Sequence, residues 1–301
     1  MTSLNPLRSI YLRLDRASQH LDSLKSEIFA YTKDRPYVPI IKDEATLQNA
    51  LAAWPGMAES KRGDWLQSVL QVIVSEVRPI PEIVPLILGD FLHNLRSSLD
   101  HLAGILVRAT GQTPIDGRSG TAFPILSKKP PTDAQTGLPA SPLLSPRTTN
   151  AIERELDLLQ PYNAGDTRGE KLALIRDLNN RDKHRTLHVV AAHIGCSRIV
   201  ATYPNGHIRG TAYRIGIARE GAWQVQRLEP QATLGGLLLA DAIPALLQTP
   251  GEMKMDVELN IIVSLDEAGT FDDPPTSVLD TMQDLLDVVK HDVVPLFAQF
   301  L

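Results

Sequence analysis

The chain has 301 residues, of which 43% are hydrophobic and 22% charged, a composition typical of a globular protein that buries a sizeable core. Its single cysteine, Cys196, excludes an intrachain disulfide and multi-cysteine zinc sites, and it favours a reducing, cytoplasmic location. The net charge of −5 excludes a protein that binds polyanions over its whole surface, and the apolar windows are too short to span a bilayer.

Apolar residues recur at helical spacing in five segments, which we predict to form one helical bundle. These helices are expected at 6–31, 82–109, 148–159, 169–187 and 276–300. Two segments rich in β-branched residues, 37–41 and 66–77, predict minor strands that accompany the bundle. Gly111 is a stop signal after the second helix, and the proline-rich stretch 124–146 indicates a surface loop.

The apolar period changes after residue 187. Short β-like runs follow one another between turn signals such as Asn205-Gly206 and Glu220-Gly221. The run Leu234–Leu247 is ambiguous and is compatible with a short helix. We therefore predict an α+β fold in which residues 1–187 and 276–301 form the bundle. A β-rich, antiparallel region, 188–275, is inserted before the last helix and packs on that bundle.

Charge is unevenly distributed along the chain. From Arg168 to Arg219 there are ten Lys or Arg against three Asp or Glu, a local charge of +7. From Glu252 to Asp287 there are ten Asp or Glu against one Lys, a local charge of −9. One interpretation is two solvated faces that partly neutralise each other, and the other is a basic cleft that suits an anionic substrate.

The predicted helix 82–109 carries polar residues on both borders of its apolar stripe. At about 100° per residue, Arg96 and Asp100 lie on one border, and Asn94 and His101 lie on the other. Arg96 and Asp100 are four residues apart, so they are expected to pair along the helix.

The predicted helix 169–187 has an apolar stripe that becomes charged in its last two turns. The stripe continues from Leu178 to Asp182 and Arg185. Buried or half-buried charges need partners, and Arg96 and Asp100 are the obvious ones on a facing helix. One interpretation is an ion-pair lock between the two helices.

The alternative interpretation is a cleft lined by Arg96, His101, Lys183 and His184. A histidine near an anchored arginine can act as general acid or base while the arginine holds a phosphate. RNA supplies its own 2′-hydroxyl nucleophile, so such a site needs neither a metal nor a cofactor. The three histidines His184, His188 and His193 lack accompanying carboxylates, and we expect no metal there.

The run Arg96-Ser97-Ser98-Leu99-Asp100-His101 resembles the Arg-(four to six residues)-His motif of the HEPN superfamily. The resemblance implies a helical bundle that acts as a metal-independent endoribonuclease in toxin or phage-defence systems, with Arg96 and His101 as the catalytic pair. It also implies a homodimer that binds RNA, with an antitoxin or another defence protein as a possible partner. Residues 80–190 further resemble a group of uncharacterised bacterial proteins.

The candidate supporting or substrate-binding residues are Asn94, Asp100, Asp182, Lys183, His184 and Arg185. Two alternatives to an RNase stay open. The protein is either a non-catalytic interaction or structural protein with an ion-pair lock, or a small-molecule binder that uses the β-rich region.

Overall fold

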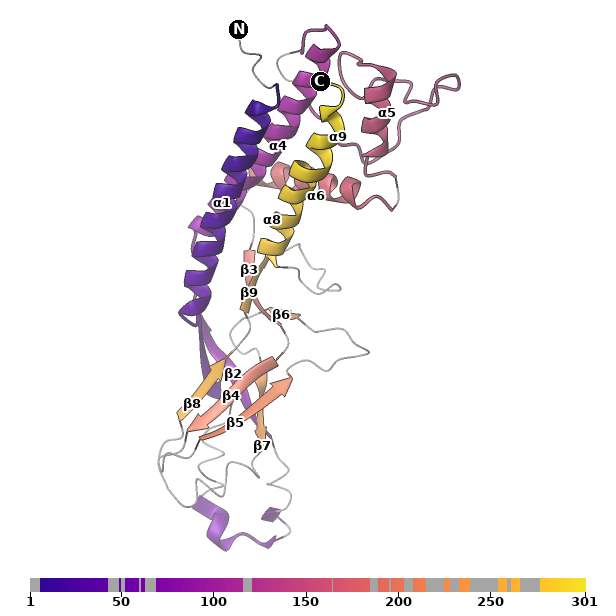
Figure 1. The fold of residues 1–301 in the computed structure, drawn as a ribbon. Helices are drawn as coiled ribbons and strands as arrows, with labels where there is room; N and C mark the ends of the chain where they lie inside the picture. The colour runs from indigo at the N-terminus through magenta and orange to yellow at the C-terminus, as the bar shows by residue number, and fades with distance from the viewer. Residues whose placement is uncertain are drawn as a thin grey trace. The chain divides into compact units, whose positions relative to one another are not determined.

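The computed structural model describes residues 6–42, 49, 52–59, 61–62, 69–115, 121–163, 165–184, 189–194, 196–202, 208–214, 225–227, 233–238, 254–258, 261–265 and 277–301. These residues form an α+β structure, which confirms the predicted fold class (Figure 1). The internal contacts of the chain divide it into two units. The helical unit comprises Met1–Ile28, Glu82–His188 and Val278–Leu301, and the β unit comprises Phe29–Pro81 and Val189–Ser277.

All five predicted helices are present, with ends that differ by a few residues. They are α1 (Arg8–Lys33), α4 (Ile83–Ala109), α5 (Asn150–Leu158), α6 (Thr167–His184) and a last helix that consists of α8 (Val278–Asp287), η2 (Val288–Val293) and α9 (Val294–Ala298). The end of the predicted helix 169–187 falls on residues 185–187, which lie outside the described residues.

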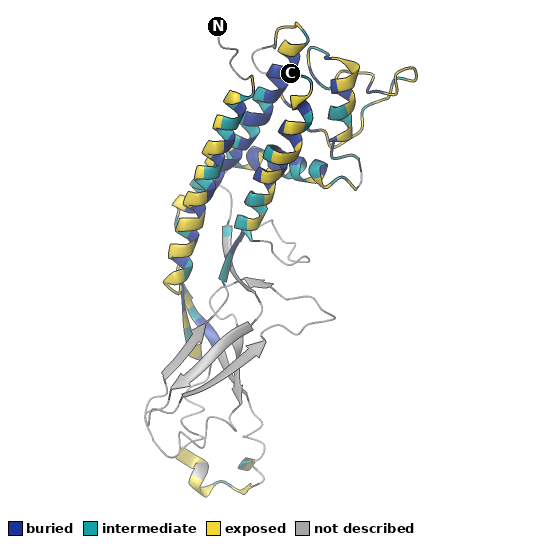
Figure 2. Ribbon diagram, viewed as in Figure 1, coloured by how far each residue is buried: buried dark blue, intermediate teal, exposed yellow. Residues whose placement is uncertain are grey.

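The core of the helical unit follows the apolar stripes (Figure 2). Along α1 every third or fourth residue is fully or almost fully buried: Ile10, Leu14, Ala17, Leu21 and Leu24. Along α4 six successive residues, Leu102–Val107, are buried, so this helix is surrounded by other elements near its end. Burying a large aliphatic side chain contributes about 1.5–3 kcal/mol, and these stripes therefore hold the bundle together.

Helix α4 ends at the predicted stop signal. The N–H of Gly111 donates to the carbonyl of Arg108 at 2.9 Å, and the N–H of Gln112 donates to that of Val107 at 3.4 Å. These two bonds form a Schellman motif, which requires a left-handed residue after the helix. Gly111 has a φ of 77°, which a residue without Cβ adopts at no steric cost.

The last helix contains one wide turn. Residues Val288–Val293 form a π-helix, and the N–H of Val294 donates to the carbonyl of Val289, five residues back. Pro295 follows directly, has no N–H, and would press its ring against the carbonyl of His291 in a regular α-helix. The wide turn accommodates the proline without ending the helix.

The extended segment after α4, residues 121–126, is held to the bundle mainly through its backbone. The buried amide of Gln160 accepts from the N–H of Leu126 at 2.8 Å and donates to the carbonyl of Pro124 at 3.1 Å. Arg176 on α6 donates to the carbonyl of Ile125 at 3.2 Å. Phe123 is buried and meets Phe297 edge to face, with ring centroids 6.2 Å apart.

The described strands of the β unit form three sheets of three strands, in the orders β1-β2-β7, β6-β3-β9 and β5-β4-β8, and every pairing is antiparallel. The strands are β1 (Tyr37–Ile41), β2 (Val69–Val77), β3 (Val189–Ile194), β4 (Cys196–Thr202), β5 (Ile208–Arg214), β6 (Val225–Arg227), β7 (Thr233–Leu238), β8 (Lys254–Glu258) and β9 (Ile261–Leu265). A short 3-10 helix, η1, spans Trp54–Gly56.

Two details of this unit differ from the sequence analysis. The ambiguous run that begins at Leu234 starts as a strand, because β7 pairs with β2, and the rest of that run lies outside the described residues. The same pairing groups β1 and β2 with the β unit, whereas the sequence analysis assigned them to the bundle as minor strands.

Candidate functional site

Arg96 is fixed by two partners on the side of α4 that faces the 121–126 segment. Its guanidinium forms an ion pair with Asp100 at 2.8 Å and donates to the carbonyl of Phe123 at 2.9 Å. Its side chain is only 17% exposed. The pairing of Arg96 with Asp100 confirms what their spacing of four residues predicted.

Asp100 completes this contact with the segment. One of its carboxylate oxygens accepts from the N–H of Phe123 at 3.0 Å. Arg96 and Asp100 together therefore satisfy both backbone polar groups of Phe123, a buried residue. We call Arg96, Asp100 and Phe123 the Arg96 lock.

Asp182 is not part of this lock, so the predicted pairing across the two helices is wrong for this residue. No hydrogen bond or ion pair joins the described Asp182 to Arg96 or Asp100. Its carboxylate instead lies against Gly89, about two turns nearer the start of α4 (7 residues). Burial, reinforced by the charge of Asp90 and opposed by His93, raises the pKa of Asp182.

The other predicted supporting residues that the structure describes, Asn94, Lys183 and His184, form no hydrogen bond or ion pair with Arg96. Lys183 and His184 are exposed at the end of α6, and Arg185 lies outside the described residues. Asn94 is half-buried, and its side-chain amide donates to the carbonyl of Asp90 one turn back on the same helix, at 2.8 Å. The described members of the predicted site therefore do not form a single cluster.

His101 lies apart from Arg96 on the surface of α4. Five residues advance a helix by about 140°, so the two side chains point in different directions. His101 is half-buried. Burial lowers the pKa of its imidazole, and the charges of Arg13 and Arg108 lower it further against the opposing effect of Asp100. The imidazole is therefore neutral at neutral pH and can accept a proton.

Two arginines that the sequence analysis missed accompany His101. Arg13 on α1 donates to the hydroxyl of Ser97, one turn before His101, at 2.9 Å. Arg108 lies two turns after His101 on the same face of α4, and its guanidinium folds back over Gly104. Among the described residues, no carboxylate forms an ion pair with either arginine. We call His101, Arg13, Arg108 and Ser97 the His101 cluster.

One sequence signal could have indicated part of this cluster. Ser97, His101 and Arg108 follow one another at spacings of four and seven residues, which places them on one helical face. Arg13 gives no such signal, because its approach to α4 depends on how α1 packs.

The basic stretch Arg168–Arg219 is largely neutralised where it runs along α6. Arg168 pairs with Asp166, Lys171 with Asp284, and Arg176 with Asp177, with distances of 2.8, 2.9 and 2.8 Å. Of these three pairs, only Lys171–Asp284 joins the basic stretch to the acidic one, and this contact favours the interpretation of two faces that partly neutralise each other.

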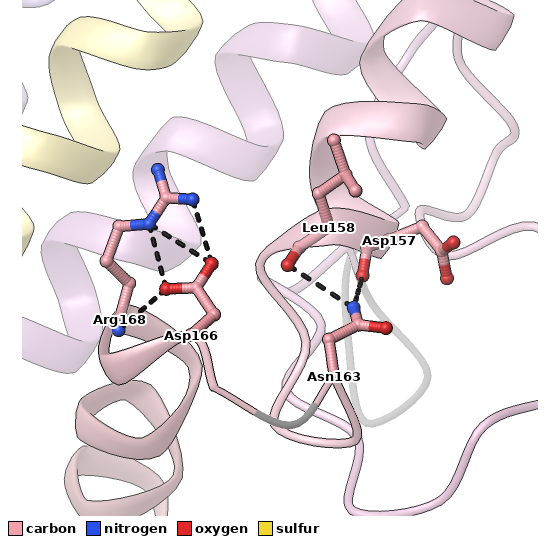
Figure 3. A network of polar contacts seen from close by, with 5 residues as sticks. All are labelled: Asp157, Leu158, Asn163, Asp166 and Arg168. Atoms are coloured by element: carbon pink, nitrogen blue, oxygen red, sulfur yellow. Dashed lines mark hydrogen bonds and ion pairs between the residues drawn. The ribbon is translucent and has the colours of Figure 1, made fainter.

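A second polar network lies at the turn from α5 to α6 (Figure 3). The amide of Asn163 donates to the carbonyls of Asp157 and Leu158, and the Tyr162 hydroxyl donates to the Asp157 carboxylate. Asp166 accepts from the backbone N–H and the guanidinium of Arg168, which lowers the pKa of this carboxyl. The contacts around Asp157 shape the turn, and the pairing of Asp166 with Arg168 begins α6, so the polar groups of each set are engaged within that set.

Within the described ranges, no group of three or more His, Cys, Asp or Glu side chains is placed to bind a metal ion. No described helix has both the length and the apolar character that crossing a membrane requires. In comparisons with known proteins, no family model, no curated protein and no solved structure matches this chain.

Proposed function

We propose that the helical unit binds RNA and cleaves it without a metal, with His101 as the proton-transferring residue and with Arg13 and Arg108 as the phosphate-binding residues. One observation carries this proposal. A half-buried imidazole of lowered pKa lies beside two arginines that form no ion pair with a carboxylate in the described part of the chain. Such a combination favours an anionic ligand next to a proton acceptor.

The chemistry is a transesterification within RNA. The neutral His101 imidazole removes the proton of a 2′-hydroxyl, the 2′-oxygen attacks the adjacent phosphorus, and the bond to the 5′-oxygen breaks. The products are a 2′,3′-cyclic phosphate and a 5′-hydroxyl, whose proton comes from water. Arg13 and Arg108 stabilise the extra negative charge on the phosphate oxygens in the transition state.

Arg96 has a different part in this proposal from the one that the HEPN resemblance implies. Its contacts with Asp100 and Phe123 support a structural role, which is the alternative that the sequence left open. Arg13 and Arg108 take its place at the phosphate. An assembly in which two copies face each other, and an antitoxin or defence partner, remain predictions that rest on the resemblance alone.

Cleavage of a labelled RNA oligonucleotide by the purified full chain in EDTA tests the proposal. We expect cyclic-phosphate products from the wild type, and a loss of cleavage of at least 100-fold in His101→Ala, within the range of general acid–base effects of about 10²–10⁴. His93→Ala is the matched control, because His93 is an exposed histidine on the same helix. Equal cleavage by His101→Ala and wild type, or folded wild type without activity, would rule out the proposed reaction.

A further inference from the structure

A hollow of about 410 Å³ lies beside the His101 cluster. It is lined by Pro6 and Ser9 near the start of α1, by Ile105, Arg108 and Ala109 near the end of α4, and by Leu301. Its volume falls in the range of small-molecule sites, about 300–1,000 Å³. Most of these residues are apolar, and two of them, Ser9 and Arg108, bring polar groups.

Arg108 connects the hollow with His101. It lines the hollow, and its charge lowers the pKa of the His101 imidazole. Its Nη1 and Nη2 atoms lie 3.6 and 3.7 Å from the position that a Cβ would take at Gly104, which is three residues after His101. The guanidinium of Arg108 therefore lies over the part of α4 between the hollow and the His101 imidazole. There it can bind a phosphate that is close to both the hollow and His101.

The composition of the hollow fits a nucleoside better than a bare anion. Pro6, Ile105, Ala109 and Leu301 offer apolar contact to a planar base, whereas inorganic phosphate has no surface to bury there. The Ser9 hydroxyl can donate to or accept from a base edge or a ribose hydroxyl. Arg108 would then hold the phosphate at the rim, on the side of His101.

We propose, building on the RNA-cleaving function above, that this hollow binds the nucleoside next to the phosphate that Arg108 holds. Bound in this way, the nucleoside fixes the position of its phosphate relative to His101. The hollow is a binding subsite, and none of its lining residues other than Arg108 touches the reacting phosphate.

Calorimetric titration of the full chain with inorganic phosphate and with the four nucleoside 3′-monophosphates tests this subsite. We expect at least one nucleotide to bind about tenfold or more tightly than phosphate. Ala109→Trp and Ser9→Trp fill the hollow from opposite helices and should reduce nucleotide affinity to that of phosphate. Arg108→Gln should weaken the binding of both ligands.

Ala151→Trp is the matched control, because Ala151 is an exposed alanine on α5, away from the lining residues, and it should leave all affinities unchanged. Two filling variants keep the test decisive if one of them fails to fold. Equal affinity of the wild type for phosphate and nucleotides, or unchanged nucleotide binding in the filled variants, would overturn the subsite.

The two proposals fail in different ways. RNA cleavage by a wild type that shows no nucleotide preference would overturn the subsite and leave the reaction in place. Nucleotide binding that the filled variants abolish, in a protein that does not cleave RNA, would overturn the reaction and support the hollow as a nucleotide site.

Discussion

Replacing Arg96 distinguishes a structural from a catalytic arginine. In Arg96→Ala the ion pair with Asp100 and the hydrogen bond to the carbonyl of Phe123 are both lost. That carbonyl belongs to a buried residue, and a buried polar group without a partner costs about 1–3 kcal/mol. Asp100 keeps the N–H of Phe123 and is 36% exposed, so water still solvates its charge and the loss of the ion pair itself adds little.

We therefore expect Arg96→Ala to lower the free energy of unfolding by about 1–3 kcal/mol, which is mainly the cost of leaving the Phe123 carbonyl without a partner. Arg96→Lys keeps the charge but cannot reach Asp100 and Phe123 in the same planar geometry, so it should lose about half as much. Urea unfolding followed by far-ultraviolet circular dichroism measures both changes.

A double-mutant cycle with Asp100→Asn gives the coupling between the two side chains, expected at no more than about 1 kcal/mol because Asp100 is partly solvated. Cleavage of RNA by Arg96→Ala below its unfolding transition should stay within about tenfold of the wild type. A change in stability below about 0.5 kcal/mol together with abolished cleavage would refute the Arg96 lock and make Arg96 the catalytic arginine of the HEPN resemblance.

Two further substitutions and one pH profile test other parts of the helical unit. Gly89→Ala would place a Cβ 2.5 Å from Oδ1 of Asp182, so the carboxylate has to move. This carboxylate is the end of a flexible side chain, and alanine favours a helix interior over glycine by about 0.5–1 kcal/mol, so we expect urea unfolding to change by less than about 1 kcal/mol, and a loss above about 2 kcal/mol would show that Asp182 cannot move. Asp182→Asn should raise the free energy of unfolding at neutral pH, because burial disfavours the charged carboxylate in the folded protein. This gain should disappear in acid, where the wild-type carboxyl is protonated in both the folded and the unfolded protein. A gain that persists in acid would argue against a raised pKa of Asp182. The rate of RNA cleavage should rise with pH through a pKa below that of a free imidazole and level off before neutrality, whereas a midpoint above neutrality would contradict the surroundings of His101.

The helices of the bundle were predictable because their apolar periods are long and regular. The pairing of Arg96 with Asp100 was also predictable, because residues four apart in a helix are neighbours whatever surrounds them. The same holds for the end of α4, since the left-handed conformation at Gly111 depends on the residue itself.

The contacts between elements were not predictable in the same way. The apolar stripe of α6 predicts which face of the helix is buried. It predicted Asp182 to lie on that face, and burial does affect the Asp182 carboxyl. It does not show how far one helix is shifted along another, and a shift of about two turns brings Asp182 to Gly89 and away from Arg96. Arg13 and Phe123 reach α4 from distant parts of the chain, so neither contact leaves a local pattern in the sequence.

The contacts that fix residues 121–126 to the bundle determine where the connection between α4 and α5 can vary in length. By fixing Phe123, Pro124, Ile125 and Leu126 to the bundle, the contacts of Arg96, Asp100, Gln160 and Arg176 divide that connection into two shorter loops. The entropy lost in closing a loop grows only with the logarithm of its length, by about 0.6 kcal/mol for each doubling. Insertions after Leu126 should therefore be tolerated in this protein, whereas an insertion within 123–126 would displace backbone groups from all of their partners at once.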